Sequence, residues 1–403
     1  MKKKDFDLTV VGAGPSGIFC AIFASERGLR VALTDRNSRI GGKIPVTGNS
    51  RCNLTNVNIS SDNYTGENPL FVRNVFGHYS SEDLIDFFRD MNLRIVSEGE
   101  KYYPATKKSE TVVEALEKRI KTKNITLFTN TNVTECAKSE GLFISKSNSG
   151  EIASESLALC TGGKSYAKIF GSGGGYSLAK SLSHTVTRLC PGLTSFDSEE
   201  SFFKELSGVS CEAEISLHCG NKRIYQGSGS LLFTHRGFSG PLVMNASNKI
   251  SKCAGGGGSL TICFLPGKIK EYDSFASYIL SKNSKLLKNS LSGIIPASLT
   301  ESAMKFLKIN ENMKAGEATP GTIAKLHKIL SNSIIKVKAN PDFNEAQVTV
   351  GGVRTTEINP KSMESKLVRN LYFAGEIIDI AGECGGYNLQ FAFSSGYLAG
   401  TFV

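Results

Sequence analysis

The chain has 403 residues, of which 40% are hydrophobic and 21% are charged. This length predicts two or three domains with ample material for a core, and the composition is typical of a soluble globular protein. No apolar run near the start is long enough for a signal peptide or a membrane span, so we expect a cytoplasmic protein without a membrane partner.

The net charge is +10, and residues 266–333 hold half of this excess, with ten Lys against five acidic residues. The lysines are spread out along the segment, which favours a solvated helical face over an RNA-contacting one. Nucleic acid is therefore not expected as a partner. The ten cysteines show no paired spacing, so we expect reduced thiols.

The first elements form a βαβ unit. Residues 6–11 are typical of a buried strand, 12–17 of a glycine turn, 18–27 of a helix, and 29–34 of a second strand that ends at Asp35. Such a unit of about thirty residues opens a parallel, doubly wound α/β sheet.

The predicted type of secondary structure changes twice in the later segments. We expect helices at 78–92 and 109–123, an antiparallel excursion from 125 to 147, and a buried strand at 156–163. From about residue 190 the pattern is that of antiparallel sheet, 270–333 is mostly helical, and a helix closes the chain. We assign three parts: 1–190 with 345–403, 191–265 with 334–344, and 266–333.

Gly12, Gly14 and Gly17 have the G-x-G-x-x-G spacing of a dinucleotide fingerprint. The motif follows a strand, opens a helix and precedes an acid, Asp35, at the distance expected for ribose recognition. Gly12 permits the tight turn, Gly14 lets the backbone approach a pyrophosphate, and Gly17 lets the helix pack on the sheet. The helix N-terminus then binds the phosphates.

Further glycine-rich strand ends favour FAD over NAD. They are the Gly41-Gly42 pair, Thr161-Gly162-Gly163, and Gly375-Glu376 with Asp379 beyond. Their distribution indicates one long cofactor across the carboxyl edge of the sheet. The other glycine-rich turn before a helix, "FGSGGGYSLAK", lacks the fingerprint spacing and a following acid, so no dedicated NAD(P) domain is expected.

The stretch "GNSRCNLTN", residues 48–56, contains a glycosylation sequon. Because export is not expected, we interpret it instead as the polar lining of a small-molecule site.

Five segments together resemble the HI0933-like flavoprotein family, whose members include enzymes described as aminoacetone oxidases and a bile-acid-pathway reductase. They are "GAGPSG", "GGKIPVTGNSRCNLTN", "LALCTGGKSY", "FTHRGFSGPLVMNAS" and "FAGEIIDIAGECGGYNLQFAFSSGYLAG". The resemblance covers nearly the whole chain. It implies an FAD domain made from both chain ends, an inserted β-barrel-like domain and a small helical domain. The chain departs from the family at "KSYA", where "KSYP" is usual, and in the shorter "GSGGGY" at 171–176.

The resemblance also implies that Arg51, Cys52 and Asn53 face the cofactor. Together, these patterns predict non-covalent FAD contacts from Gly12, Gly14, Pro15, Ser16, Gly17, Asp35, Arg36, Gly42, Lys43, Arg51, Cys52, Asn53, Val133, Thr161, Gly162, Gly163, Gly375, Glu376, Asp379, Gly386, Asn388, Leu389 and Gln390. The helix that begins near Asn388 would point its N-terminal dipole at the flavin.

Candidate catalytic residues are Arg51, Cys52, His235 and Asn388. Cys52 and Cys384 are interpreted as small buried residues, with redox activity as the alternative. His235 and Arg236 belong either to a turn or to a substrate contact. The histidines show no metal spacing, so no metal is expected.

The predicted function is that of an FAD-dependent oxidoreductase that moves a hydride between flavin N5 and a small organic substrate or NAD(P)H. Reduction of a C=C bond with transient NAD(P)H and oxygen-consuming oxidation of an amine remain alternatives. A flavin-containing RNA-binding or tRNA-modifying protein is the alternative from another class.

Overall fold

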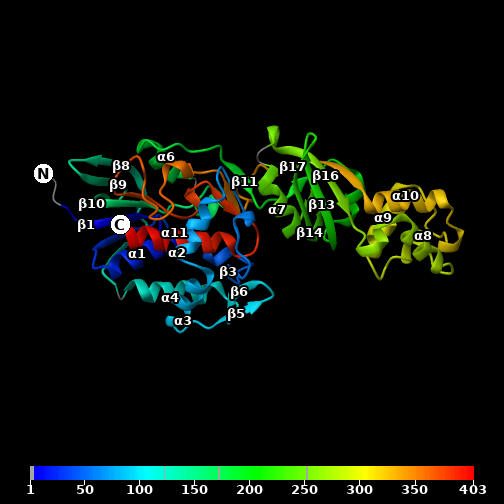
Figure 1. Cartoon of the computed structure of the whole chain (residues 1–403), viewed down its shortest axis with the longest axis horizontal. Helices are drawn as coiled ribbons and strands as arrows, with labels where there is room; N and C mark the ends of the chain where they lie inside the picture. The colour runs from blue at the N-terminus through cyan, green and yellow to red at the C-terminus, as the bar shows by residue number, and fades with distance from the viewer. Residues whose placement is uncertain (1–3, 122, 171–172, 251–252) are drawn as a thin grey trace. The chain divides into compact units, whose positions relative to one another are not determined.

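The computed structural model describes residues 4–121, 123–170, 173–250 and 253–403, which divide into two compact units (Figure 1). Unit 1 contains residues 1–190 and 343–403, so both ends of the chain build it. Unit 2 is the continuous segment 191–342. Gly171 and Ser172 of the predicted glycine-rich turn lie outside the described residues.

Within the described part of unit 1, seven strands form a mixed sheet. Five of them are parallel neighbours in the order β7 (Ile125–Phe128), β2 (Val31–Thr34), β1 (Phe6–Val11), β10 (Gly150–Leu159) and β19 (Leu371–Phe373). The first half of β10 pairs antiparallel with β9 (Leu142–Ser147), which pairs in turn with β8 (Val133–Ser139). β1 and β2 are largely buried, as parallel strands covered on both faces require.

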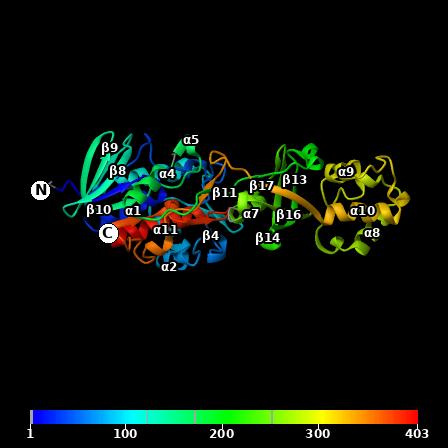
Figure 2. The same ribbon diagram turned by 90° about the horizontal axis from the view of Figure 1, so that it is seen from above.

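Two helices from opposite ends of the chain lie side by side, α1 (Pro15–Glu26) and α11 (Tyr387–Phe402) (Figures 1 and 2). Their apolar faces meet at Phe19 and Phe393, whose ring centroids are 4.4 Å apart. The other elements of unit 1 are α2 (Phe71–His78), α3 (Ser81–Asp90), α4 (Ser109–Lys121), α5 (Ala167–Phe170), α6 (Gly174–Ser181), β3 (Thr55–Asn56), β4 (Tyr64–Gly66), β5 (Ile95–Glu98), β6 (Lys101–Pro104), β18 (Val348–Val350) and β20 (Ile380–Gly382).

In the described part of unit 2, six strands close into an antiparallel barrel. Three helices of this unit, α8 (Tyr272–Ser281), α9 (Ala297–Phe306) and α10 (Pro320–Ser331), gather at one end of this barrel (Figures 1 and 2). The strands in barrel order are β12 (Phe196–Asp197), β15 (Gly237–Ser239), β14 (Lys222–Thr234), β13 (Ser210–Cys219), β16 (Gly257–Cys263) and β17 (Ser333–Ala339), and the helices are α7 (Pro241–Ile250), α8 (Tyr272–Ser281), α9 (Ala297–Phe306) and α10 (Pro320–Ser331). β11 (Cys190–Gly192) spans the boundary of the two units.

The predicted fold class is confirmed, with three local corrections. The predicted helix 78–92 is α3, Ser81–Asp90, which begins later than expected because Ser80 and Asp83 form a capping box, whereas His78 is the last residue of α2. The strand predicted as antiparallel at residue 125 is β7, a parallel neighbour of β2. Cys219 and Cys253 form a disulfide, with Cα atoms 5.9 Å apart, although reduced thiols were expected. None of the helices in the described ranges combines the length and apolarity that a bilayer span requires.

Candidate functional site

The turn between β1 and α1 packs closely against the backbone at Gly12 and Gly17 and faces open space at Gly14. Gly12 has φ +103°, and a Cβ there would lie 2.5 Å from the carbonyl oxygen of Cys160. A Cβ on Gly17 would lie 1.8 Å from the carbonyl oxygen of Gly12, whereas nothing lies within 4 Å of that position on Gly14. Gly14 is the N-cap of α1 and no side chain caps this helix. The first-turn N–H groups are therefore suited to an anion at the open side.

Asp35 lies at the end of β2, beside the same turn. Its carboxylate accepts hydrogen bonds from the backbone N–H groups of Ala13 at 2.7 Å and Asn37 at 2.8 Å. Burial raises the pKa of Asp35, and these two hydrogen bonds oppose the rise. The N–H of Thr131 donates to the Asp35 carbonyl at 2.8 Å, so β8, which begins at Val133, starts close to this acid.

The second glycine pair returns the chain to the first turn. The N–H of Gly41 donates to the carbonyl of Ala13 at 2.8 Å. A Cβ on Gly42 would lie 3.1 Å from the Cα of Gly14 and 3.8 Å from Pro15. The backbone of residues 41–42 therefore forms one wall of the open side. Arg36 is exposed to solvent.

The two ends of the chain meet at Ser16. A Cβ on Gly375 would lie 2.5 Å from the Ser16 hydroxyl oxygen, and one on Gly396 would lie 2.2 Å from the Ser16 carbonyl oxygen. Gly375 also donates its N–H to the hydroxyl of Ser395 at 2.9 Å. The strand end that follows β19 and the closing helix α11 are thus fixed against the first turn of α1.

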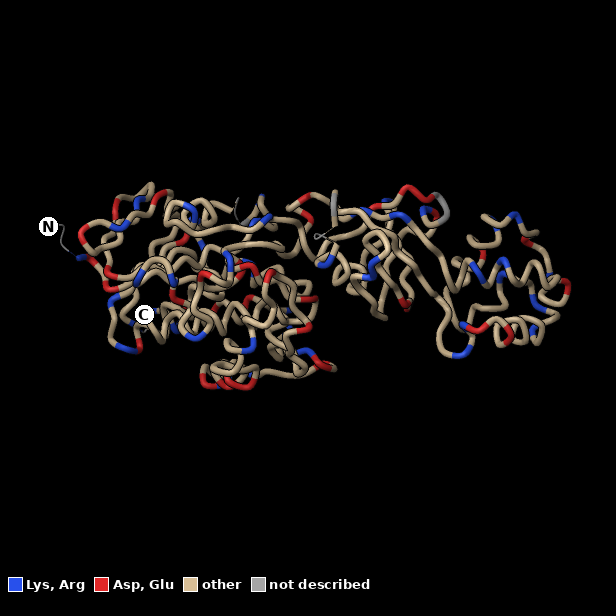
Figure 3. Tube along the Cα trace, turned by 45° about the horizontal axis from the view of Figure 1, so that its top comes forward, with Lys and Arg blue, Asp and Glu red and all other residues tan. Residues whose placement is uncertain are grey.

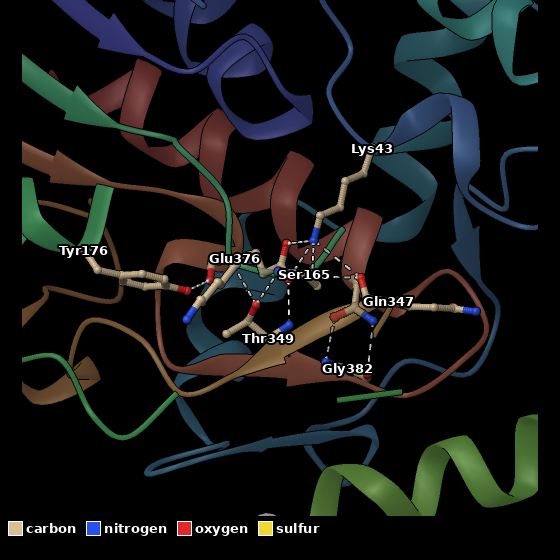
Figure 4. Close-up of polar contacts among 9 residues, drawn as sticks. Lys43, Ser165, Tyr176, Gln347, Thr349, Glu376 and Gly382 are labelled. Carbon is tan, nitrogen blue, oxygen red and sulfur yellow. Dashed lines mark hydrogen bonds and ion pairs between the residues drawn. The ribbon is translucent and has the colours of Figure 1, made fainter. Parts of the chain in front are cut away.

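A half-buried ion pair lies at the carboxyl edge of the sheet (Figure 4). The Nζ of Lys43 is 2.6 Å from Oε2 of Glu376, and the two side chains are 18% and 17% exposed. Glu376 also accepts hydrogen bonds from the Ser165 hydroxyl at 3.0 Å and the Thr349 N–H at 2.8 Å. Lys43 donates to the Ser165 hydroxyl and to the Gln347 carbonyl. We call these five residues the Lys43–Glu376 cluster.

The glycines after β10 line this cluster. A Cβ on Gly163 would lie 2.5 Å from the Thr349 hydroxyl oxygen and 2.7 Å from Oε1 of Glu376. A Cβ on Gly162 would lie 4.0 Å from Oε2 of Glu376. The hydroxyl oxygen of Thr161 is buried and has no hydrogen-bond partner among the described residues.

Arg51 is engaged by the β5–β6 hairpin. Its guanidinium forms an ion pair with Glu98 and lies 4.4 Å from the ring centroid of Tyr103. Lys107 and Arg51 hold the pKa of Glu98 below its usual value. The predicted contact of Arg51 with a flavin would therefore compete with these partners.

Cys52 and Asn53 occupy the buried side of the same loop. Cys52 is fully buried, and burial raises the pKa of its thiol to about 12. It is therefore a neutral thiol at physiological pH. Burial likewise raises the pKa of Cys384 to about 12. Oδ1 of Asn53 is buried and has no hydrogen-bond partner in the described part of the chain.

The start of α11 is organised by its own side chains. Asn388 accepts from the Gly382 N–H at 2.8 Å and donates to the Gly382 carbonyl at 3.0 Å, which braces the loop before the helix. Gly386 is the N-cap and no side chain caps the helix. Leu389 is buried. Gln390 donates to the Ser80 carbonyl at 3.0 Å, and its buried Oε1 has no described partner.

Asp379 and His235 are the remaining predicted site residues. The carboxylate of Asp379 accepts from the Glu67 N–H at 3.2 Å and the Thr187 hydroxyl at 3.1 Å, so it ties segments of unit 1 together. His235 is exposed in the turn between β14 and β15 of unit 2.

The residues present fit an FAD molecule. The open side at Gly14 suits a diphosphate, and the Asp35 carboxylate suits ribose hydroxyl groups. Three buried oxygen atoms of predicted contact residues, on Asn53, Thr161 and Gln390, have no partner in the described ranges. Buried polar atoms normally have a partner, so a polar ligand near them would remove an energetic cost.

Comparisons with known proteins point the same way. Residues 6–402 match the model of the HI0933-like protein Rossmann domain. A 3-dehydro-bile acid delta(4,6)-reductase of Clostridium scindens is 31% identical over 399 residues, which cover 97% of each chain. A ribosomal RNA dihydrouridine synthase of Escherichia coli is 29% identical over 402 residues, which cover 97% of this chain and 96% of that one. A protein of the same name from Haemophilus influenzae is also 29% identical.

Among solved structures, the open conformation of a flavocytochrome c3 fumarate reductase shares the fold. Its TM-score is 0.50 at 16% identity, covering 99% of this chain and 78% of that one. The match over nearly the whole length of the family model and of a relative above 30% identity shows that this chain belongs to the HI0933-like family and is an FAD-dependent oxidoreductase.

Proposed function

We propose that the protein is a reductase that saturates a C=C bond conjugated to a carbonyl group. One observation carries this proposal: the two kinds of relative that match over nearly the whole chain bear names that describe such a reaction. A delta(4,6)-reductase of a 3-keto compound and a dihydrouridine synthase both add a hydride to one carbon and a proton to its neighbour. The carbonyl makes the more distant carbon electrophilic.

Bound FAD supplies hydride transfer through its N5 atom. The protein supplies binding and orientation. The N–H groups at the start of α1 bind the diphosphate, and Asp35 accepts from ribose hydroxyl groups. The uncapped N-terminus of α11 carries a partial positive charge that stabilises negative charge on a reduced ring placed before it. Asn388 holds the preceding loop in place.

NAD(P)H is the proposed electron donor, and it visits the site transiently. The sequence has one G-x-G-x-x-G motif that is followed by an acid, at Gly12–Gly17 with Asp35, and this fits one resident dinucleotide. Amine oxidation with oxygen as the electron acceptor is the competing chemistry.

Anaerobic stopped-flow absorbance separates these chemistries. NADH or NADPH should bleach the flavin, and a 3-keto steroid with conjugated C=C bonds should restore the yellow colour without oxygen. Bleaching by a primary amine, with recovery only on adding oxygen, would contradict the proposal and support the oxidase. Besides the steroid and oxygen, uridine nucleoside is tested as an oxidant of the reduced flavin, which shows whether a pyrimidine ring can accept the hydride.

Uridine in ribosomal RNA is a second candidate substrate, because two relatives at 29% identity are named as ribosomal RNA dihydrouridine synthases. Incubation of an unmodified ribosomal RNA transcript with the protein and NADPH should produce a nucleoside heavier than uridine by two hydrogen atoms, as detected by mass spectrometry. A transcript without this nucleoside after flavin turnover with a steroid enone would assign the protein to small substrates.

A further inference from the structure

A row of polar side chains crosses four strands of the unit 2 barrel. Arg223 of β14 is the cross-strand partner of His218 on β13, and His218 is the partner of Ser259 on β16. Ser259 is in turn the partner of Lys336 on β17. Cross-strand partners project from the same face of a sheet. These four residues, which we call the basic row, therefore share one face of the barrel.

This face is the outer one. The neighbours Leu217, Leu260 and Ile335 alternate with the row and are buried in the barrel core. Arg223 and Lys336 are exposed, whereas His218 and Ser259 are partly exposed.

The adjoining positions add hydrogen-bond donors. Gln226, Ser216, Thr261 and Ile334 form the next outward row by the same registers, and Ile334 is 65% exposed. Lys338 is the next outward residue of β17 after Lys336. Its cross-strand partner Asp197 is occupied by an ion pair with Arg236.

The outward residues of β13 also include two acids, Glu212 and Glu214, of which Glu214 pairs with Lys270. Among the described residues, no ion pair involves Arg223, Lys336 or Lys338. The sequence between Glu317 and Asp342 contains four lysines and no acidic residue. Other Lys and Arg positions recur along unit 2, where several are interspersed with acidic ones (Figure 3).

We propose that the basic row and Lys338 bind the sugar–phosphate backbone of RNA. With strands about 4.8 Å apart, the row extends about 14 Å from β14 to β17. This length is enough to follow several consecutive phosphates of one RNA strand. Arg, Lys, Ser and Gln are among the side chains that bind phosphate oxygens. The single exposed Ile334 offers little area for insertion into a lipid surface.

This inference rests on the second candidate substrate of the proposed function, and binding can be tested apart from turnover. The probe is a fluorescein-labelled RNA hairpin, and the measurement is fluorescence anisotropy of the full-length flavoprotein over a range of salt concentrations. The test variant is Arg223→Gln/Lys336→Gln/Lys338→Gln. The control, Lys108→Gln/Lys118→Gln/Lys121→Gln, removes the same charge from exposed lysines at α4 of unit 1.

The wild type should bind with an affinity that falls steeply as salt increases. The test variant should lose at least about tenfold in affinity, and its slope of log K against log salt should be shallower by about 2 to 3, whereas the control should match the wild type. Retained flavin absorbance and an unchanged melting temperature show that the variant is folded.

Equal losses in both variants would overturn the proposal, because they would indicate unspecific attraction. It would equally fall if the wild type did not bind the hairpin near physiological salt, or if phosphatidylserine vesicles bound through the row and RNA did not. Reduction of a steroid enone without any RNA binding would leave the proposed reaction intact and remove only this surface. RNA binding through the row without reduction of any C=C bond would do the reverse.

Discussion

Replacement of Gly396 by Ala tests the contact between the two chain ends. The new Cβ would lie 2.2 Å from the carbonyl oxygen of Ser16. Ordinary contacts lie near 3.5 Å, so α1 and α11 must separate by about 1 Å. That movement also loosens the Phe19–Phe393 contact, whose centroids are 4.4 Å apart. Overpacking of this kind costs about 1–3 kcal/mol, and the helix propensity of Ala returns about 1 kcal/mol.

The net loss, centred on about 1 kcal/mol, lowers the melting temperature of a domain of this size by about 2–4 °C. Flavin fluorescence during a thermal ramp measures it, because release of the cofactor reports the unfolding of unit 1. Gly77→Ala in α2 is the matched control, since nothing lies within 4 Å of its Cβ position. If Gly396→Ala and Gly77→Ala melted within about 1 °C of each other, the described packing of α1 on α11 would be refuted.

Three further predictions concern single groups. Lys43→Gln and Glu376→Gln should each lower the affinity for flavin, because each single change leaves a half-buried charge without its partner. The double variant should therefore lose less binding free energy than the sum of the two single losses. Isothermal titration of the apoprotein with FAD measures these affinities, and strict additivity would argue against the cluster. Cys52 should resist iodoacetamide at pH 8 in the folded protein, since burial raises its pKa to about 12; rapid labelling detected by peptide mass spectrometry would contradict its burial. Burial lowers the pKa of His184, so the unfolded state binds the proton more tightly, and stability should fall as pH drops below about 6.5, its unfolded value. His184→Gln should show a weaker fall between pH 7 and pH 5.5 in chemical denaturation, whereas identical pH profiles would exclude His184 as the cause.

The sequence predicts local parts of this site well because their chemistry is contained in a few consecutive residues. Gly12 and Gly17 have the close backbone contacts that their spacing implies, and the Cβ position of Gly14 is open. Asp35 lies beside the turn because β1 and β2 are neighbours in any βαβ unit.

Partners from distant segments were not predictable in the same way. Ser165 and Thr349 bind Glu376, yet Thr349 belongs to a short buried strand without any motif. Its role depends on which strand ends the fold brings together. The ion pair of Arg51 with Glu98 depends likewise on the placement of the β5–β6 hairpin, which no spacing in the sequence indicates.

Strand β7 shows how tertiary context decides between two local patterns. Its residues 125–128 have an irregular burial pattern, so the alternation that separates edge from central strands is weak. Its parallel pairing with β2 follows from the helix α4 before it, which forms a crossover from the β2 side of the sheet.

The packing of α1 on α11 sets an order of events during protein synthesis. Unit 2 is one uninterrupted segment and can begin to collapse as soon as it has left the ribosome. The aromatic face of α1 around Phe19 stays uncovered until residues 387–402 have been synthesised, which takes about 20–80 s at typical elongation rates. During that interval the nascent chain displays apolar surface, which makes it a natural client for chaperones that hold early segments until late ones arrive.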